Sequence, residues 1–368
     1  MDLEFEADVR LWVQRKRQQR DEAVSSDLSA ERGTSATKIV TLDKNSDGNV
    51  SSSSRRSPHA VNKELPVRAP AAVRAAKLAD ASDELETEGT STMPLCWADP
   101  WDEERKAAAV KMIKQQGEYL TPFWQDKYKA EAGKYWHLFY KRNTDNFYKD
   151  RHYLRMEFPE LLLKHDASVT VENRLQLLEV GCGVGNAVVP LLDINPNLYV
   201  NAIDFARSAI EILRQHKAVA KYPGRLIANV CNVIADPLPL PSDVFGQLDM
   251  VLCMFVISAI SPEHQLGAFR KLATELKPGG KLLFRDYGRY DEAQLRFKKG
   301  SKVQENLYVR NDGTLAFYFE LNELTALCKQ AGLKPVEDRC GYIRIAQANR
   351  QQGVSRHRVF VQAVFEKE

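Results

Sequence analysis

The sequence lacks the features that mark a secreted, membrane-spanning or zinc-binding protein. Its six cysteines include no Cys-x-x-Cys pair and no His/Cys cluster at metal-ligand spacing, so we expect free thiols, a reducing compartment and no metal. No apolar run approaches the ~20 residues that cross a bilayer. The acidic N-terminus is unlike a signal peptide or a mitochondrial presequence. These absences predict the cytoplasm, with the nucleus as the alternative.

Aromatic residues are missing from Asp21 to Met93, a stretch rich in Ser, Asp, Glu, Ala and Pro. Because it has too little apolar area to offset its ordering entropy, this composition predicts disorder. We therefore expect residues 1–93 to be a largely disordered tail, 94–160 a helical segment with many basic and aromatic side chains, and 161–368 one α/β domain. The net charge of +3 is too small to require a nucleic-acid partner.

The most informative motif runs from Leu177 to Ala187, where an apolar strand containing Glu179 enters a turn with three glycines spaced two apart, Gly181, Gly183 and Gly185. Such glycines allow a tight strand-to-helix turn and the close approach of a ligand. Asp204 ends the next apolar run about 20 residues on, where a carboxylate can bind a ribose diol. A dinucleotide fold has its third glycine where Asn186 stands. The pattern therefore favours S-adenosylmethionine over NAD, and a turn without a ligand is the remaining alternative.

Strand and helix patterns alternate along the domain, which predicts a Rossmann-like α/β fold with a doubly wound, mostly parallel sheet. The expected parallel strands are Arg174–Val180, Leu198–Asp204, Arg225–Val230, Leu248–Cys253 and Gly280–Arg285. Helices are expected at Trp101–Gln116, Phe123–Arg142, near Val188, and at Ala206–His216 and His264–Leu276. Two last runs, Leu333–Cys340 and Arg358–Phe365, should pair antiparallel at a sheet edge, and Asn311-Asp-Gly313 predicts a hairpin.

Ligands of such sheets bind beyond the carboxyl ends of the strands. Asn232 follows the third expected strand there, and its side-chain oxygen could accept from an adenine amino group, although an Asn in this place often only caps a turn. We expect the cofactor to lie among Trp136, Tyr140, Arg151, Glu179, Gly181, Gly183, Gly185, Asn186, Asp204, Phe205, Cys231, Asn232 and Phe255.

Lysines and arginines interleave with aromatic residues between Trp124 and Arg155. Cations that meet phosphates, together with rings that stack on bases, are typical of an RNA-binding surface. An amphipathic helix with core aromatics and solvated lysines explains the same pattern equally well.

Several blocks together resemble the methyltransferase-like family that makes 3-methylcytidine in tRNA. They are the glycine turn, Phe139–Arg142, Phe147–His152, Glu157–Pro159 and Phe284–Gly300. The form of Arg289–Gly300 is similar to that of members acting on threonine and arginine tRNAs, and the resemblance implies the cytidine that opens the anticodon loop, position 32, as the target. Relatives usually carry an Asp where Asn232 stands, so we expect the cofactor to bind with some loss of affinity.

Cytosine N3 has an in-plane lone pair at neutral pH, so its methylation needs alignment and electrostatics rather than a general base. Asp286, at the end of the fifth expected strand, is the candidate carboxylate for the positive charge that develops on the ring. Arg285 and Tyr287 complete the expected catalytic set. A salt bridge from Asp286 to Arg285 or Arg289 is the structural alternative, and Tyr287 and Tyr290 could stack on the base or pack the hairpin.

The expected contacts with substrate RNA are made by Lys141, Arg142, Lys149, Arg289, Arg296, Lys298 and Lys299. Four of the basic residues could instead close a lid over the cofactor, namely Lys141, Arg142, Lys149 and Arg151. Two other functions stay open, a methyltransferase acting on a protein or small molecule and a non-catalytic tRNA-binding subunit. The sequence also leaves open whether a partner such as an aminoacyl-tRNA synthetase assists.

Overall fold

The computed structural model describes residues 101–144, 147–349 and 354–368. The expected tail over residues 1–93, and the start of the expected helical segment, lie outside the described residues.

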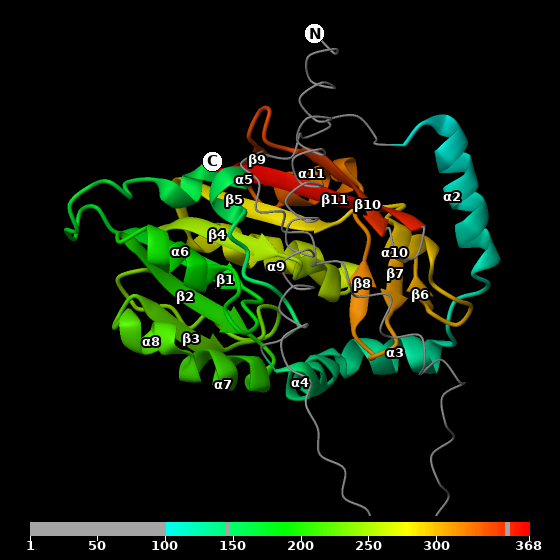
Figure 1. Ribbon diagram of the computed structural model, residues 1–368, viewed down its shortest axis with the longest axis horizontal. Coiled ribbons are helices and arrows are strands. Elements are labelled where there is room, and N and C mark those ends of the chain that lie inside the picture. The colour runs from blue at the N-terminus through cyan, green and yellow to red at the C-terminus, as the bar shows by residue number, and fades with distance from the viewer. Residues whose placement is uncertain (1–100, 145–146, 350–353) are drawn as a thin grey trace, which may run out of the picture. The chain divides into compact units, whose positions relative to one another are not determined.

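A doubly wound sheet forms the centre of the described fold, and five of its strands pair in parallel in the order β5-β4-β1-β2-β3 (Figure 1). They are β1 Leu175–Val180, β2 Leu198–Asp204, β3 Leu226–Val230, β4 Leu248–Met254 and β5 Leu276–Tyr287. The predicted strands are confirmed, but β5 begins four residues before the predicted Gly280. A register shift against β4, between Leu248 and Met250, accommodates its Pro and Gly residues within the strand.

Alternate side chains of the strands point into two hydrophobic cores, one on each face of the sheet. Leu177 packs with Leu191 on one face, and Leu178 packs with Phe269 on the other. The first core is covered by α6 Val188–Ile194 and α7 Arg207–Gln215, and the second by α9 Pro262–Glu275 and α11 Leu321–Gln330. Both faces of the sheet are therefore buried, as parallel sheets require.

The antiparallel part of the sheet differs from the prediction. The final strand, β11 Val354–Lys367, lies between β5 and a strand that the sequence reading missed, β10 Gly341–Asn349. The predicted partner, β9 Leu333–Pro335, covers only the far end of β11. β10 is therefore the edge strand, because every residue of β10 pairs with β11.

The basic and aromatic segment forms two helices rather than the predicted one, α3 Pro122–Ala130 and α4 Ala132–Asn143. They meet at Glu131, whose φ of −96° and ψ of 11° interrupt the helical backbone. The break lets α4 pack beside α7, while α3 lies beside the smaller sheet (Figure 1). The Ser208 hydroxyl fixes α4 by donating to the His137 carbonyl oxygen at 3.0 Å.

The predicted hairpin is confirmed and belongs to a three-stranded sheet of β6 Lys302–Gln304, β7 Leu307–Val309 and β8 Leu315–Phe317. The other described helices are α2 Glu103–Gln115, α5 Leu154–Glu157, η3 Pro159–Leu162, α8 Lys217–Lys221, η4 Ile257–Ala259 and α10 Glu292–Leu295. Across residues 101–144, 147–349 and 354–368, none of the helices has the length and apolar content needed to cross a membrane.

Candidate active site

The glycine turn at the end of β1 is docked on the carboxylate that ends β2. The Gly183 amide donates to Asp204 Oδ2 at 2.9 Å, and the Ala206 amide donates to Asp204 Oδ1 at 2.8 Å. Each carboxylate oxygen keeps a second lone pair, so Asp204 can still accept from the hydroxyls of a ribose. Burial raises the pKa of Asp204 to about 6, and the two amide hydrogen bonds oppose this rise.

Gly183 has a φ of 53°, in the left-handed region that favours glycine. A Cβ atom placed there would lie 2.5 Å from the hydroxyl oxygen of Tyr140. Tyr140 therefore occupies the space that a side chain at this position would fill, and the contact of Gly183 with the cofactor stays a prediction. Tyr140 belongs to a layer of aromatic rings over the turn. Trp136 and Phe139 also come from α4, and Phe205 follows β2.

The segment from Tyr148 to Arg151 also contacts the glycine turn. The Asn186 side-chain amide donates to the Tyr148 carbonyl oxygen at 3.0 Å, and the Arg151 amide donates to the Asn186 carbonyl oxygen at 2.7 Å. The structure therefore places Arg151 beside the glycine turn, whereas Lys141 lies exposed on α4. Of the four residues that could close a lid, Arg151 is the one that the structure places beside the glycine turn.

Two buried polar atoms near the turn, Glu179 Oε2 and Trp136 Nε1, have no hydrogen-bond partner among the described residues. Burial raises the pKa of Glu179 to about 8, and the charge of Arg151 acts in the opposite direction. Buried polar groups are normally paired, so an unpartnered acceptor and an unpartnered donor indicate a ligand that carries complementary groups. An α-ammonium suits Glu179 and an α-carboxylate suits Trp136, and both groups belong to S-adenosylmethionine. These residues therefore fit the expected cofactor.

Asn232 and Cys231 form a turn after β3. The Asn232 side-chain oxygen accepts from the Ile234 amide at 3.0 Å, while the Asn232 amide donates to Asp236 Oδ2 at 2.8 Å. The turn-capping alternative thus describes this Asn, although its oxygen retains one lone pair for an adenine. Cys231 is buried, and its burial raises the pKa of its thiol to about 11.

A row of aromatic rings leads away from Arg151. Its guanidinium carbon lies 4.8 Å from the centroid of the Phe255 ring, and Phe255 in turn lies 5.2 Å from Tyr287 and 5.4 Å from Phe360. Phe255 adopts a φ of 58°, which is unusual for a bulky residue. Such backbone strain persists where the surroundings enforce it, and it is common at ligand sites.

Asp286 lies fully buried at the carboxyl end of β5. Its carboxylate accepts from the backbone amides of Ser258 and Tyr287, both at 2.9 Å. Burial raises the pKa of Asp286 to about 6, and these hydrogen bonds limit the rise.

The salt-bridge alternative for Asp286 is wrong, because both arginines have other partners. Arg285 lies 3.1 Å from Glu157 Oε2 and donates through Nε to Gln362 at 2.8 Å, and Arg289 pairs with Glu320. Arg285 and Asp286 are consecutive on a strand and point to opposite faces. Arg285 is accordingly a positioning residue that joins α5 to the sheet, rather than a group that faces a base.

The two tyrosines pack within the hairpin region. Tyr287 lies against Tyr318 and Phe360, and Tyr290 makes an edge contact with Trp101, the ring centroids being 6.2 Å apart. Both tyrosines are buried, so the packing alternative describes this state of the protein.

The expected RNA-binding cations form two exposed groups, one of Lys141, Arg142 and Lys149, and one of Arg296, Lys298 and Lys299. Arg289 is less exposed and is held by Glu320.

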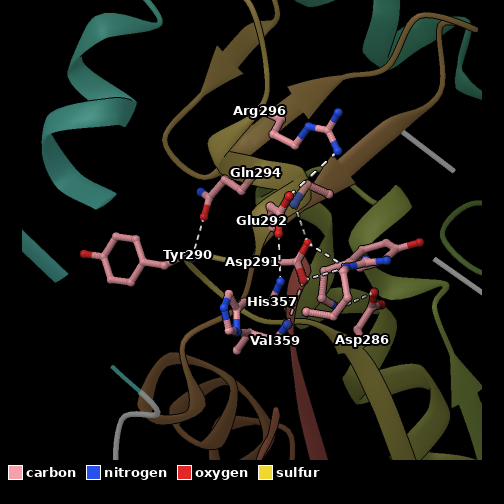
Figure 2. A network of polar contacts seen from close by, with 11 residues as sticks. Asp286, Tyr290, Asp291, Glu292, Gln294, Arg296, His357 and Val359 are labelled. Atoms are coloured by element: carbon pink, nitrogen blue, oxygen red, sulfur yellow. Dashed lines mark hydrogen bonds and ion pairs between the residues drawn. The ribbon is translucent and has the colours of Figure 1, made fainter. Parts of the chain in front are cut away.

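A buried network anchors the second basic group, and the sequence reading missed it (Figure 2). Asp291 caps α10 by accepting from the Ala293 amide at 2.8 Å, and its other oxygen accepts from the Val359 amide at 2.7 Å. Arg358 pairs with the same carboxylate at 2.9 Å. The helix-capping position of Asp291 was readable in the sequence, but its partner in β11 was not.

Residues 101–144, 147–349 and 354–368 contain no group of three or more His, Cys, Asp or Glu side chains that could hold a metal ion.

Known proteins resemble this chain over most of its length. A family model described as a methyltransferase domain matches residues 122–338. The Drosophila melanogaster protein named tRNA N(3)-methylcytidine methyltransferase Mettl2 is 38% identical over 270 residues, covering 73% of this chain and 81% of that protein. The human protein named tRNA N(3)-cytidine methyltransferase METTL6 is 38% identical over 257 residues, covering 69% of this chain and 87% of that protein. A solved N1-methyltransferase from Burkholderia thailandensis aligns at 14% identity and a TM-score of 0.39, covering 75% of this chain and 95% of its own.

Proposed function

The chain belongs to the tRNA N(3)-cytidine methyltransferase family, and from that premise we propose that it methylates N3 of the cytidine that opens the anticodon loop, in threonine or arginine tRNAs. The observation that carries the proposal is the buried Asp286 carboxylate. It lies at the carboxyl end of β5, next in sequence to Tyr287, whose ring belongs to the aromatic row that leads to the glycine turn.

S-adenosylmethionine supplies the methyl group when it is bound, as an electrophilic carbon on a sulfonium. Glu179 and Trp136 offer the buried acceptor and donor for its amino-acid end, and Asp204 offers the lone pairs for its ribose. The aromatic layer of α4, with Tyr140 against Gly183, excludes water from the turn. Water exclusion strengthens the electrostatic contacts that align the reacting groups.

No proton has to leave cytosine N3 for methylation, because the lone pair that attacks is already free. The ring becomes cationic as the new bond forms, and its exocyclic amino group becomes a stronger hydrogen-bond donor. The Ser258 and Tyr287 amides already orient the carboxylate, so Asp286 stabilises the transition state more than the ground state once the base has reached it. Its raised pKa, about 6, still leaves it mostly ionised at neutral pH.

The RNA surface consists of the two exposed basic groups, Lys141, Arg142 and Lys149 on one side and Arg296, Lys298 and Lys299 on the other. They meet phosphates on either side of the target, which must leave its stack to reach Asp286. The choice of threonine and arginine tRNAs rests on the form of Arg289–Gly300, the loop that carries the second group.

The test is methyl transfer to purified threonine, arginine and serine tRNA transcripts, each with C or U at the target position, followed by nucleoside mass spectrometry. We expect 3-methylcytidine only in the C forms of the threonine or arginine tRNAs, and a loss of product with Asp286→Asn. Product confined to serine tRNA would overturn the proposed branch. Methylation of protein or small molecules, with none of tRNA, would establish the alternative class.

A further inference from the structure

The structure divides the aromatic residues of the basic and aromatic segment into covered and exposed rings. On α4, Phe139 and Tyr140 are buried and the other rings are half-buried. At the start of α3, by contrast, Phe123 is 67% exposed and Trp124 is 38% exposed. The interpretation of the aromatic residues as core therefore explains α4, but it leaves these two rings of α3 without a role.

The two exposed rings are held in place from below. Trp124 stacks on Tyr128, with ring centroids 5.8 Å apart and planes at 30°, and Tyr128 packs against a core of the domain. Phe123 meets Trp124 edge to face, at 5.4 Å and 77°. A single exposed apolar residue is normal on a protein surface, so the neighbours of this ring decide its role.

Cations lie over the exposed rings. Lys127 Nζ is 5.0 Å from the ring centroid of Trp124 and 6.0 Å from that of Phe123. Lys302 Nζ lies 4.6 Å from the ring centroid of Tyr119, which is also exposed. Rings beside ammonium groups fit a partner that is both aromatic and anionic, as a nucleotide is. An apolar protein segment would instead remove the ammonium groups from water without pairing them, which is costly.

These rings adjoin the second basic group. The Leu120 amide donates to the Lys302 carbonyl oxygen at 2.8 Å, so the segment before α3 runs beside β6. A Cβ atom at Gly117 would lie 3.4 Å from Cγ of Lys299, in the loop that carries the second basic group. Phe123 follows Leu120 by three residues, which places their Cα atoms within about 10 Å of each other. The exposed rings therefore extend the surface that the proposed function assigns to RNA.

The smaller sheet connects the exposed rings to the proposed catalytic carboxylate. The Ser258 amide, in η4, donates to Asp286, and β8 packs against η4. β8, β7 and β6 are neighbours in the smaller sheet, and α3 contacts β6. Two strand spacings of about 4.8 Å and one packing distance of about 10 Å put the rings on the order of 20 Å from the carboxylate. A few nucleotides of a single-stranded loop can span that distance.

We propose that Phe123 stacks on an unpaired base of the tRNA anticodon loop, a few nucleotides from the target cytidine. Trp124 holds the ring, and Lys127 meets the adjoining phosphate. This inference rests on the proposed function. Unpaired bases of RNA loops bind proteins by stacking on aromatic side chains. Because every base has an aromatic face, such a stack fixes the path of the loop rather than the identity of one base.

The test is a cycle that changes the protein and the substrate together. The protein change is Phe123→Ala, and the substrate change is an abasic nucleotide placed in turn at each unpaired position of the loop except the target. Phe123→Ala alone should lower tRNA affinity by about 5- to 100-fold, the effect of losing one base stack. One abasic position should cause a similar loss in the wild type but little further loss in the variant, because both changes remove the same stack.

Phe245→Ala is the matched control. Phe245 is also exposed, by 47%, but it lies three residues before β4, at the edge of the sheet opposite to Asp286. This variant should keep wild-type tRNA affinity and every abasic penalty. Phe123→Tyr keeps a ring and should recover most of the affinity. Affinity for S-adenosylhomocysteine and the thermal midpoint should be unchanged in all three variants, since each substitution is at an exposed position.

Unchanged tRNA affinity in Phe123→Ala would overturn the inference. So would penalties that multiply at every abasic position, because no base would then share a contact with the ring. A defect that appears only when a protein partner is added would make this surface a protein-docking site instead. Wild-type methylation of unmodified tRNA reports separately on the proposed function. A wild-type enzyme that methylates cytidine, with no coupling between Phe123 and any base, leaves the function intact and refutes the stacking role alone.

Discussion

Glu179 is expected to make cofactor binding dependent on pH near neutrality. Its side chain is 3% exposed, its Oε2 has no partner in the described residues, and burial raises its pKa to about 8. Free protein at pH 7 therefore holds this carboxyl mainly in its protonated form. The α-ammonium of S-adenosylhomocysteine favours the carboxylate, so binding should release the proton.

The size of the effect follows from the ionised fraction of Glu179. With a pKa of about 8, roughly 1% of the protein is ionised at pH 6, about 10% at pH 7 and about half at pH 8. Affinity should therefore rise by nearly tenfold from pH 6 to 7, about fivefold from pH 7 to 8, and less than about twofold beyond. Asp204, with a pKa of about 6, adds to the slope only at the acidic end.

Calorimetric titration with S-adenosylhomocysteine, in buffers of different ionisation enthalpy, measures both the affinity and the protons released. Near pH 7 we expect close to one proton per ligand bound. Glu179→Gln keeps the shape of the side chain and should abolish the slope between pH 7 and 8. An affinity that is flat over this range in the wild type, or an unchanged slope in the Gln variant, would refute the assignment of Glu179 to the ammonium.

Three further predictions concern other parts of the site. Gly183→Ala should weaken S-adenosylhomocysteine binding by about 10-fold or more, because the new Cβ would lie 2.5 Å from the Tyr140 hydroxyl oxygen and a φ of 53° disfavours any side chain. The same titration in a Tyr140→Phe background should recover part of the lost affinity. No recovery would argue against the clash with Tyr140. Asp286→Asn should lower the single-turnover rate about 10²-fold with nearly unchanged affinities, and an unaltered rate would make Asp286 structural. The double variant Lys141→Ala with Arg142→Ala should flatten the slope of log affinity for tRNA against log salt concentration by roughly one unit for each phosphate that is no longer neutralised. Cofactor affinity should not change. Loss of cofactor binding with normal tRNA binding would instead identify this segment as a lid.

The parallel half of the fold could be predicted from the sequence because each strand is a short apolar run bounded by polar or glycine residues. The antiparallel half could not be predicted as well. The strand Gly341–Asn349 mixes polar and apolar residues, and only its partner in β11 specifies it. The break at Glu131 was likewise not predicted, and it places α4 beside α7, which lies more than sixty residues further along the chain.

The site shows the same division between local and long-range information. Glu179 and Asp204 follow from the motif at the strand ends, and the structure places both beside the glycine turn. The partners of Arg285 lie in α5 and β11, far away in sequence, so a catalytic role and a structural one could not be separated beforehand. The pairing of Asp291 with Arg358 spans a similar distance and left no sequence signal.

The place of β11 between β5 and β10 has a consequence for biosynthesis. A ribosome that has completed β5 must add roughly 70 more residues before β11 can reach it, which takes on the order of ten seconds at ordinary elongation rates. During that interval the outer edge of β5, which carries Asp286, has no neighbouring strand and can pair with other chains. Nascent chains that stall in this window are therefore the ones we expect chaperones to hold, and a short C-terminal truncation should appear in cells as aggregated rather than merely inactive protein.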